Sequence, residues 1–186
     1  MCGIAGYINH ERNLLKDIQK HNAITLKMCN ALRHRGPDAN GNWVGENAAF
    51  SHSRLAVIDI EGGVQPMKRT VAGYDFIITY NGELYNADEL KRDLKRYGYH
   101  FTTESDTEVL LYSYIHYGTG CAERLNGIYA FCVWDSMRRR AFLCRDRFGV
   151  KPLFYTFSDG ELVFASELKA LFEHPGVNPY VSKEGL

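Results

Sequence analysis

Residues 128–134, with the sequence Ile-Tyr-Ala-Phe-Cys-Val-Trp, constrain the fold of this chain more than any other segment. The run has the length and residue types of a strand, and it is apolar on both faces. Such a strand must be covered on two sides, which one antiparallel sheet with a solvated face cannot provide. We therefore predict two sheets packed together with helices outside.

The rest of the chain alternates between helical and strand-like patterns. Apolar or alternating runs predict strands at residues 3–9, 48–58, 76–80, 140–145, 151–157 and 161–165. Three-to-four spacing and capping signals predict helices at residues 15–32, 86–97 and 109–117. Residues 33–41 and 61–73 are expected to be connections, and the strands after residue 127, joined by short turns, predict a meander.

Composition indicates a single cytoplasmic domain with a small ligand. The 186 residues are 45% hydrophobic and carry 22 basic and 22 acidic side chains, so no net positive charge attracts nucleic acid or an anionic membrane. Five cysteines without a CxxC pair favour a reducing compartment and no zinc site. No signal peptide or membrane span is expected.

Cys2 is the first candidate for chemistry. Removal of Met1 would leave a cysteine with a free α-amine, and both groups titrate near neutral pH. An N-terminal amine can activate a nucleophile on the same residue. The alternative is an inert thiol that happens to lie near the start of the chain.

Asn81-Gly82 follows a predicted strand and has two interpretations. Asn-Gly is a strong hairpin-turn signal. An Asn amide beside a Gly backbone N–H also offers two donors at one point, which suits an oxyanion hole for acyl transfer.

Three other segments carry charged candidates, each with a structural alternative. Arg54 lies in an apolar strand, where either a ligand carboxylate or an internal Asp or Glu would pair with it. Asp106 begins a helix, where capping is the default role. The basic run at residues 33–38 could position a ligand or simply end a helix. His34 and His52 could act as bases, but neither has an evident acid partner in the sequence.

Taken in order, six segments resemble the glutaminase domain of glutamine-dependent asparagine synthetases. They are Cys2-Gly3-Ile4, residues 33–38, His52-Ser53-Arg54-Leu55 with Ile58-Asp59, residues 81–86, Ser105-Asp106 and residues 145–153. Ala-Ser-Glu-Leu-Lys at residues 165–169 points the same way. The resemblance to this class II glutamine amidotransferase group implies the α+β N-terminal-nucleophile (Ntn) hydrolase fold, a four-layer αββα sandwich with two mainly antiparallel sheets.

The resemblance implies a role for each candidate. Cys2 would attack the side-chain amide of L-glutamine, with its α-amine as the base and Asn81 and Gly82 as the oxyanion hole. Arg54 would bind the substrate carboxylate and Asp106 its ammonium group. Further substrate contacts are expected from backbone groups at Leu55, Val57, Ile58 and Glu83. The loop at Arg35 and Gly36 would support the N-terminus, and residues 39–43 would close over glutamine. No metal ligand is expected.

The resemblance also sets the expected domain organisation. Residues 2–171 would form a glutamine amidotransferase type 2 domain, and residues 172–186 would begin a linker to a synthetase domain. That domain, with a Ser-Gly-Gly-rich pyrophosphate loop absent from this sequence, would use ATP and Mg and the ammonia to convert aspartate to asparagine. The glutaminase domain itself needs no cofactor. A homodimer is compatible with this organisation.

Two other functions remain open from the sequence. Related amidotransferases deliver ammonia to different acceptors, so the domain could serve another synthetase. A non-catalytic glutamine-binding module would also use Arg54 and Asp106, but it would not need Cys2, Asn81 or Gly82.

Overall fold

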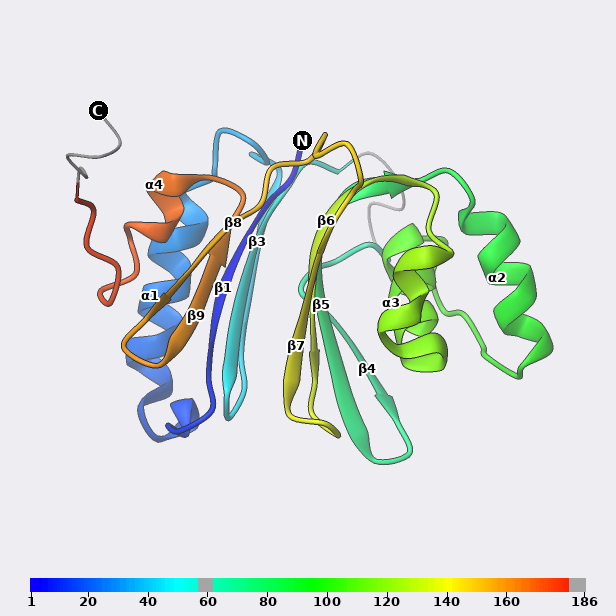
Figure 1. Cartoon of the computed structure of the whole chain (residues 1–186), viewed down its shortest axis with the longest axis horizontal. Coiled ribbons are helices and arrows are strands. Elements are labelled where there is room, and N and C mark those ends of the chain that lie inside the picture. The colour runs from blue at the N-terminus through cyan, green and yellow to red at the C-terminus, as the bar shows by residue number, and fades with distance from the viewer. Residues whose placement is uncertain (57–61, 181–186) are drawn as a thin grey trace.

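The computed structural model describes residues 1–56 and 62–180, and it contains two antiparallel sheets packed face to face (Figure 1). The five-stranded sheet has the order β2 (Ala39–Val44), β3 (Ala48–Arg54), β1 (Gly3–Asn9), β9 (Glu161–Ala165), β8 (Phe154–Ser158). The four-stranded sheet has the order β4 (Met67–Val71), β5 (Tyr74–Leu84), β6 (Gly127–Asp135), β7 (Arg140–Arg145).

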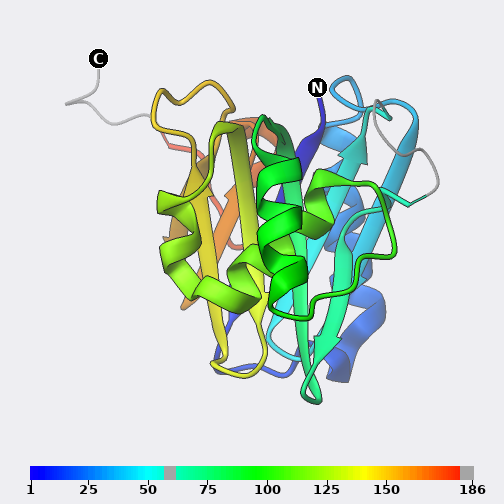
Figure 2. The same cartoon turned by 90° about the vertical axis from the view of Figure 1, so that its right-hand side faces the viewer.

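Helices cover the outer face of each sheet and complete four layers. The five-stranded sheet is covered by α1 (Ile18–Ala31), which follows the 3₁₀ turn η1 (Leu14–Asp17), and by α4 (Leu168–Leu171). The other sheet is covered by α3 (Asp106–Tyr117), which leads into η2 (Gly118–Glu123), and by α2 (Ala87–Arg96) packed against α3. Figure 2 looks onto α2 and α3 from outside. The predicted αββα layering is confirmed.

Strand β6 explains why the sandwich is needed. Phe131 and Val133 pack on one face, in the cluster that contains the α3 residues Leu110 and Leu111. Cys132 and the other alternate residues of β6 pack on the opposite face, in the cluster between the two sheets. Both faces of β6 are therefore buried, as its apolar sequence predicts.

Strand β1 shows the same two-sided burial in the other sheet. Ile4 and Ile8 face the four-stranded sheet, whereas Ala5 and Tyr7 face the cluster under α1. All seven residues of β1 are buried, and the strand pairs with β3 on one edge and β9 on the other. The N-terminus consequently lies between the two sheets at one end of the sandwich (Figure 1).

The predicted meander, the connection at residues 61–73 and the loop at residues 33–41 need correction. The meander is wrong: β7 pairs with β6 and β8 pairs with β9, so the chain crosses between sheets after β7. The predicted connection at residues 61–73 contains strand β4, and the predicted loop at residues 33–41 runs into strand β2. Both strands lie at sheet edges, where polar sequences such as Lys68-Arg69-Thr70 lack the apolar pattern of central strands.

Residues 86–89 and 105–108 have sequences that resemble capping boxes, but neither forms a complete box in the structure. Ser105 caps α3, because its side chain accepts a hydrogen bond from the Thr107 backbone N–H. Glu108 does not complete that box and instead pairs with Arg69 at 2.9 Å. Asn86 makes no side-chain cap and instead bonds to the chain at residues 124–126.

In the described residues, no helix has the length and apolar character needed to cross a membrane.

Phe164 tests the packing between the sheets. It is fully buried on β9 and meets Phe50 with ring centroids 5.5 Å apart. Phe164→Ala should lower the unfolding free energy by about 3–5 kcal/mol and the melting temperature by on the order of 10 °C. Phe157→Ala, which removes the same side chain where it is 75% exposed on β8, should change stability by less than about 0.5 kcal/mol. Equal thermal shifts in the two variants would contradict this packing.

Candidate active site

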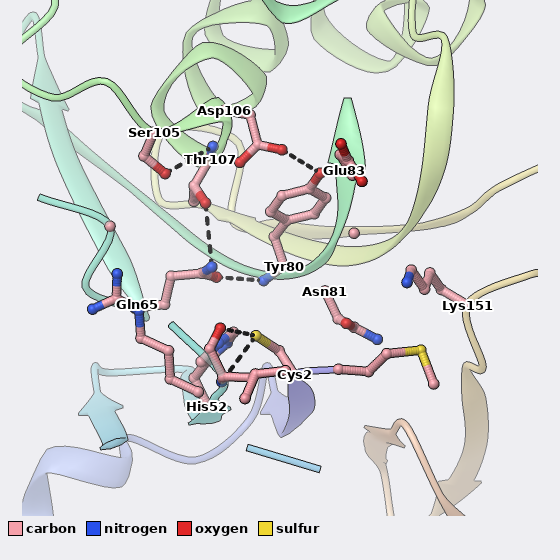
Figure 3. A pocket seen from close by; sticks show the side chains of 15 residues that line it. Cys2, His52, Gln65, Tyr80, Asn81, Glu83, Ser105, Asp106, Thr107 and Lys151 are labelled. Atoms are coloured by element: carbon pink, nitrogen blue, oxygen red, sulfur yellow. Dashed lines mark hydrogen bonds between the residues drawn. The ribbon is translucent and has the colours of Figure 1, made fainter. Parts of the chain in front are cut away.

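A cavity of about 240 Å³ opens at the end of the sandwich where β1 begins. It is smaller than the ~300 Å³ at the lower limit for drug-sized ligands, which suits a small polar molecule. Figure 3 shows the side chains that line it. They are Met1, Cys2, His52, Arg54, Leu55, Gly63, Gln65, Tyr80, Asn81, Gly82, Glu83, Ser105, Asp106, Thr107 and Lys151. Seven of the nine predicted site residues are therefore in one place.

Cys2 is half-buried at the floor of the cavity and comes immediately before β1. Its Sγ lies 3.4 Å from the Leu55 backbone nitrogen and 3.5 Å from the Leu55 carbonyl oxygen. The Cys2 carbonyl oxygen accepts a hydrogen bond from Arg35 Nε at 3.0 Å. The residue is thus held through both its side chain and its backbone, and the Leu55 N–H is placed to stabilise a thiolate.

Asn81 and Gly82 lie inside β5, opposite Ala130 and Tyr129 of β6, so the hairpin interpretation is wrong. Asn81 Nδ2 is buried and has no hydrogen-bond partner among residues 1–56 and 62–180. A buried donor without a partner costs about 1–3 kcal/mol, so this amide is available to a bound acceptor.

The Gly82 N–H points away from β6, toward the open edge of β5. Tyr80 N–H donates to Gln65 and Leu84 N–H donates to Asp106, so neither faces β6. Because alternate N–H groups of a strand point the same way, the Gly82 N–H lies between them, on the edge left open where β4 ends. A Cβ at position 82 would lie 2.4 Å from the Ile128 carbonyl oxygen, so glycine is required there.

Asp106 supplies a carboxylate to the wall of the cavity from the N-terminus of α3. Its Oδ2 accepts hydrogen bonds from the Tyr80 hydroxyl at 2.8 Å and from the Leu84 N–H at 3.1 Å. Burial raises the pKa of Asp106, although these two hydrogen bonds oppose the effect. A cationic ligand beside this carboxylate would restore the balance toward its ionised form.

Arg54 lies at the end of β3, is 9% exposed and lines the same cavity. Leu55 follows it and contacts Cys2. Glu83 is exposed at the mouth. The two remaining predicted contacts, Val57 and Ile58, lie outside the described residues. Binding of a substrate carboxylate by Arg54 stays a prediction.

The two histidines considered as possible bases have different surroundings. His52 is 1% exposed, and burial together with the nearby Arg54 charge lowers its pKa to about 3, so it is neutral. His34 Nε2 lies 3.0 Å from Glu167 Oε1, an acid partner that sequence separation hides. The Gly36 carbonyl oxygen accepts a hydrogen bond from the Ser53 hydroxyl, which fixes this loop against β3.

Gln65 and Lys151 line the cavity, but the sequence analysis gave neither of them a role in the site. Gln65 joins β5 to α3, because its amide accepts from Tyr80 N–H and donates to Thr107 Oγ1. Lys151 reaches the cavity from the loop after β7, within the predicted motif at residues 145–153 (Figure 3).

Residues 39–43, expected to close over a ligand, instead lie in the paired strand β2. Within the described ranges, no three His, Cys, Asp or Glu side chains converge to hold a metal.

The raised pKa of Asp106 predicts how the stability of the protein depends on pH. A carboxyl whose pKa is higher in the folded state leaves stability intact below its unfolded pKa and reduces it as pH rises through the folded pKa. Asp106→Asn stays neutral at both pH 4 and pH 8. Its melting temperature relative to the parent protein should therefore be higher at pH 8 than at pH 4. A difference in melting temperature that is the same at both pH values would contradict the assignment.

Comparison with known proteins gives the family. The sequence model of the family described as "Glutamine amidotransferase domain" matches residues 1–186. The chain is 45% identical over 186 residues to asparagine synthetase (glutamine-hydrolyzing) 3 of Bacillus subtilis, covering all of this chain and 30% of the relative. It is 40% identical over 171 residues to asparagine synthetase (glutamine-hydrolyzing) 1 of the same organism, covering 92% of this chain and 26% of the relative. The chain thus spans less than a third of the length of these relatives.

Solved structures support the same assignment. Glutamine phosphoribosylpyrophosphate amidotransferase from B. subtilis superposes with a TM-score of 0.74 at 26% identity, covering 92% of this chain and 43% of that chain. A structure described as the allosteric regulatory enzyme of purine biosynthesis gives a TM-score of 0.75 at the same identity and coverage. These neighbours confirm the Ntn sandwich. The chain belongs to the family of class II glutamine amidotransferase domains.

Proposed function

We propose that this domain hydrolyses L-glutamine to L-glutamate and ammonia through a thioester on Cys2. One observation carries the proposal: the Cys2 thiol shares a cavity with the unpartnered Asn81 amide, the Asp106 carboxylate and Arg54. A nucleophile, an oxyanion donor and one group for each charged end of a free amino acid are what this reaction needs. The family and its relatives' names support glutamine as the substrate.

The reaction begins once Met1, which lines the cavity, is removed and the α-amine of Cys2 is free. The amine takes the thiol proton, and Sγ attacks the amide carbon of glutamine. The developing oxyanion accepts hydrogen bonds from Asn81 Nδ2 and the Gly82 N–H. The ammonium of Cys2 then protonates the leaving nitrogen, the carbon–nitrogen bond breaks, and ammonia departs.

Water completes the cycle. The α-amine, neutral again, takes a proton from water as the oxygen attacks the thioester carbon. The carbon–sulfur bond breaks, the thiol recovers its proton, and glutamate leaves. Arg54 and Asp106 hold the α-carboxylate and α-ammonium of the substrate throughout, which selects a free amino acid over a peptide.

We also propose a setting for this activity. In the full-length protein a C-terminal synthetase domain in the same chain would use ATP, Mg and the released ammonia to make asparagine from aspartate in the cytoplasm. The names of the relatives and the fraction of their length that this chain spans support that arrangement. No cofactor is proposed for the glutaminase domain, residues 2–171 stay its predicted extent, and the homodimer stays an expectation.

Cys2→Ala tests the proposal. Removing the nucleophile should reduce glutamate release from glutamine by at least about a thousandfold, because the remaining groups form no thioester. Cys144→Ala, which removes a half-buried thiol on β7 outside the cavity, should retain the parent rate. Equal rates of glutamate release in the parent and in Cys2→Ala would reject the proposal.

The pH dependence tests the base. An α-amine has an unperturbed pKa of about 7.7–8.0, and only its neutral form accepts the thiol proton. The rate of glutamate release should therefore fall as the pH is lowered from 9 to 5. A rate that stays constant over this range would exclude the α-amine as the base.

A further inference from the structure

The segment Ser166-Glu167, between β9 and α4, contacts the start of β1 at several points. Ser166 N–H donates to the Ile4 carbonyl oxygen at 2.8 Å, and the Ile4 N–H donates to Ser166 Oγ at 3.0 Å. Ser166 is fully buried. The first residues of β1 are therefore fixed by a segment more than 160 positions away in the sequence.

Glu167 extends this contact to the nucleophile through Arg35. Its Oε1 accepts a hydrogen bond from Arg35 Nη1 at 2.9 Å, while Arg35 Nε donates to the Cys2 carbonyl oxygen at 3.0 Å. The Arg35 side chain is 9% exposed. The guanidinium is thus held by the carboxylate on one side and holds the Cys2 backbone on the other.

The charges around Glu167 match this arrangement. Its carboxylate meets Arg35, His34 at 3.0 Å and Lys169 at 3.2 Å. Burial tends to raise the pKa of Glu167, but hydrogen bonds from Arg35, His34 and Lys169 outweigh it and lower the pKa to about 2. This lowered pKa favours the ionised carboxylate that pairs with Arg35.

We propose that Glu167 is a positioning residue for Cys2 that acts through Arg35. The proposal rests on the proposed function, in which Sγ and the α-amine of Cys2 must meet the substrate amide at one angle. Cys2 comes at the end of the chain after Met1 is removed, where a strand normally frays. The Glu167–Arg35 link fixes its carbonyl group, and misplacement by about 1 Å can cost a hundredfold in rate.

The alternative is an ordinary ion pair that stabilises the fold and nothing more. Such a pair lowers the melting temperature when it is broken from either side, but the folded protein keeps the kcat of the parent. A positioning role predicts instead that Glu167 matters only while Arg35 is present, which a double-mutant cycle measures directly.

The cycle compares kcat for glutamine hydrolysis in Arg35→Met, Glu167→Ala and the double variant. Glu167→Ala should lower kcat about ten- to a hundredfold, with KM for glutamine changed less than about threefold. The double variant should be no slower than Arg35→Met alone. Glu167→Gln, which keeps the size and one acceptor oxygen, should lose less than Glu167→Ala and covers the case in which the alanine variant does not fold.

Asp75→Asn provides a matched control. It removes a carboxylate from another ion pair, with Lys68 Nζ at 2.6 Å, at the end of β5 opposite to Asn81 and Gly82. Its kcat should equal that of the parent. Parent-like kcat in both Glu167 variants, or losses that multiply in the double variant, would overturn the proposal.

A second readout separates this proposal from the proposed function. If the parent protein does not hydrolyse glutamine, the proposed function fails, and the same cycle is measured on the rate of Cys2 alkylation by iodoacetamide, followed in the N-terminal peptide. Non-multiplicative changes in that rate would still support the link from Glu167 to Cys2. Multiplicative changes, or none, would reject it.

Discussion

The site depends on β1 being the central strand of its sheet. β1 is hydrogen-bonded to β3 and β9 and covered on both faces by buried side chains. The first strand of a domain is usually prone to fraying, but this one is fixed along both edges. A residue that precedes such a strand has a defined position, and Cys2 is that residue. Pairing within the five-stranded sheet thereby fixes the position of Cys2 in the cavity wall.

The second requirement is the open edge of β5. β4 pairs with β5 only as far as Ile78, so within residues 1–56 and 62–180 the backbone beyond Ile78 has no neighbouring strand on that side. Gln65 and Asp106 take up the N–H groups on either side of Gly82. The sandwich brings this edge to the cavity that contains Cys2, so the proposed oxyanion donors come from one sheet and the proposed nucleophile from the other.

Local pattern was sufficient for the layers and for the central strands. The apolar run in β6 predicts two-sided cover, and the predicted strands at residues 3–9, 140–145 and 161–165 agree with β1, β7 and β9. Local pattern failed where pairing is decided by distant chain: Asn81-Gly82 has a turn sequence, yet pairing with β6 holds it in a strand. Likewise, Arg35 and His34 both pair with the Glu167 carboxylate. Glu167 is distant in the sequence, so no spacing rule predicts these contacts. Motif resemblance located most of the site because it carries that tertiary information, which periodicity lacks.

The intact mass of the protein, before and after reaction with an electrophilic glutamine analogue, tests the central claim most directly. The account predicts a chain without Met1 that gains one molecule of analogue, attached to Cys2. A protein that hydrolyses glutamine while retaining Met1, or that carries the analogue on another residue with Cys2 unmodified, would contradict it.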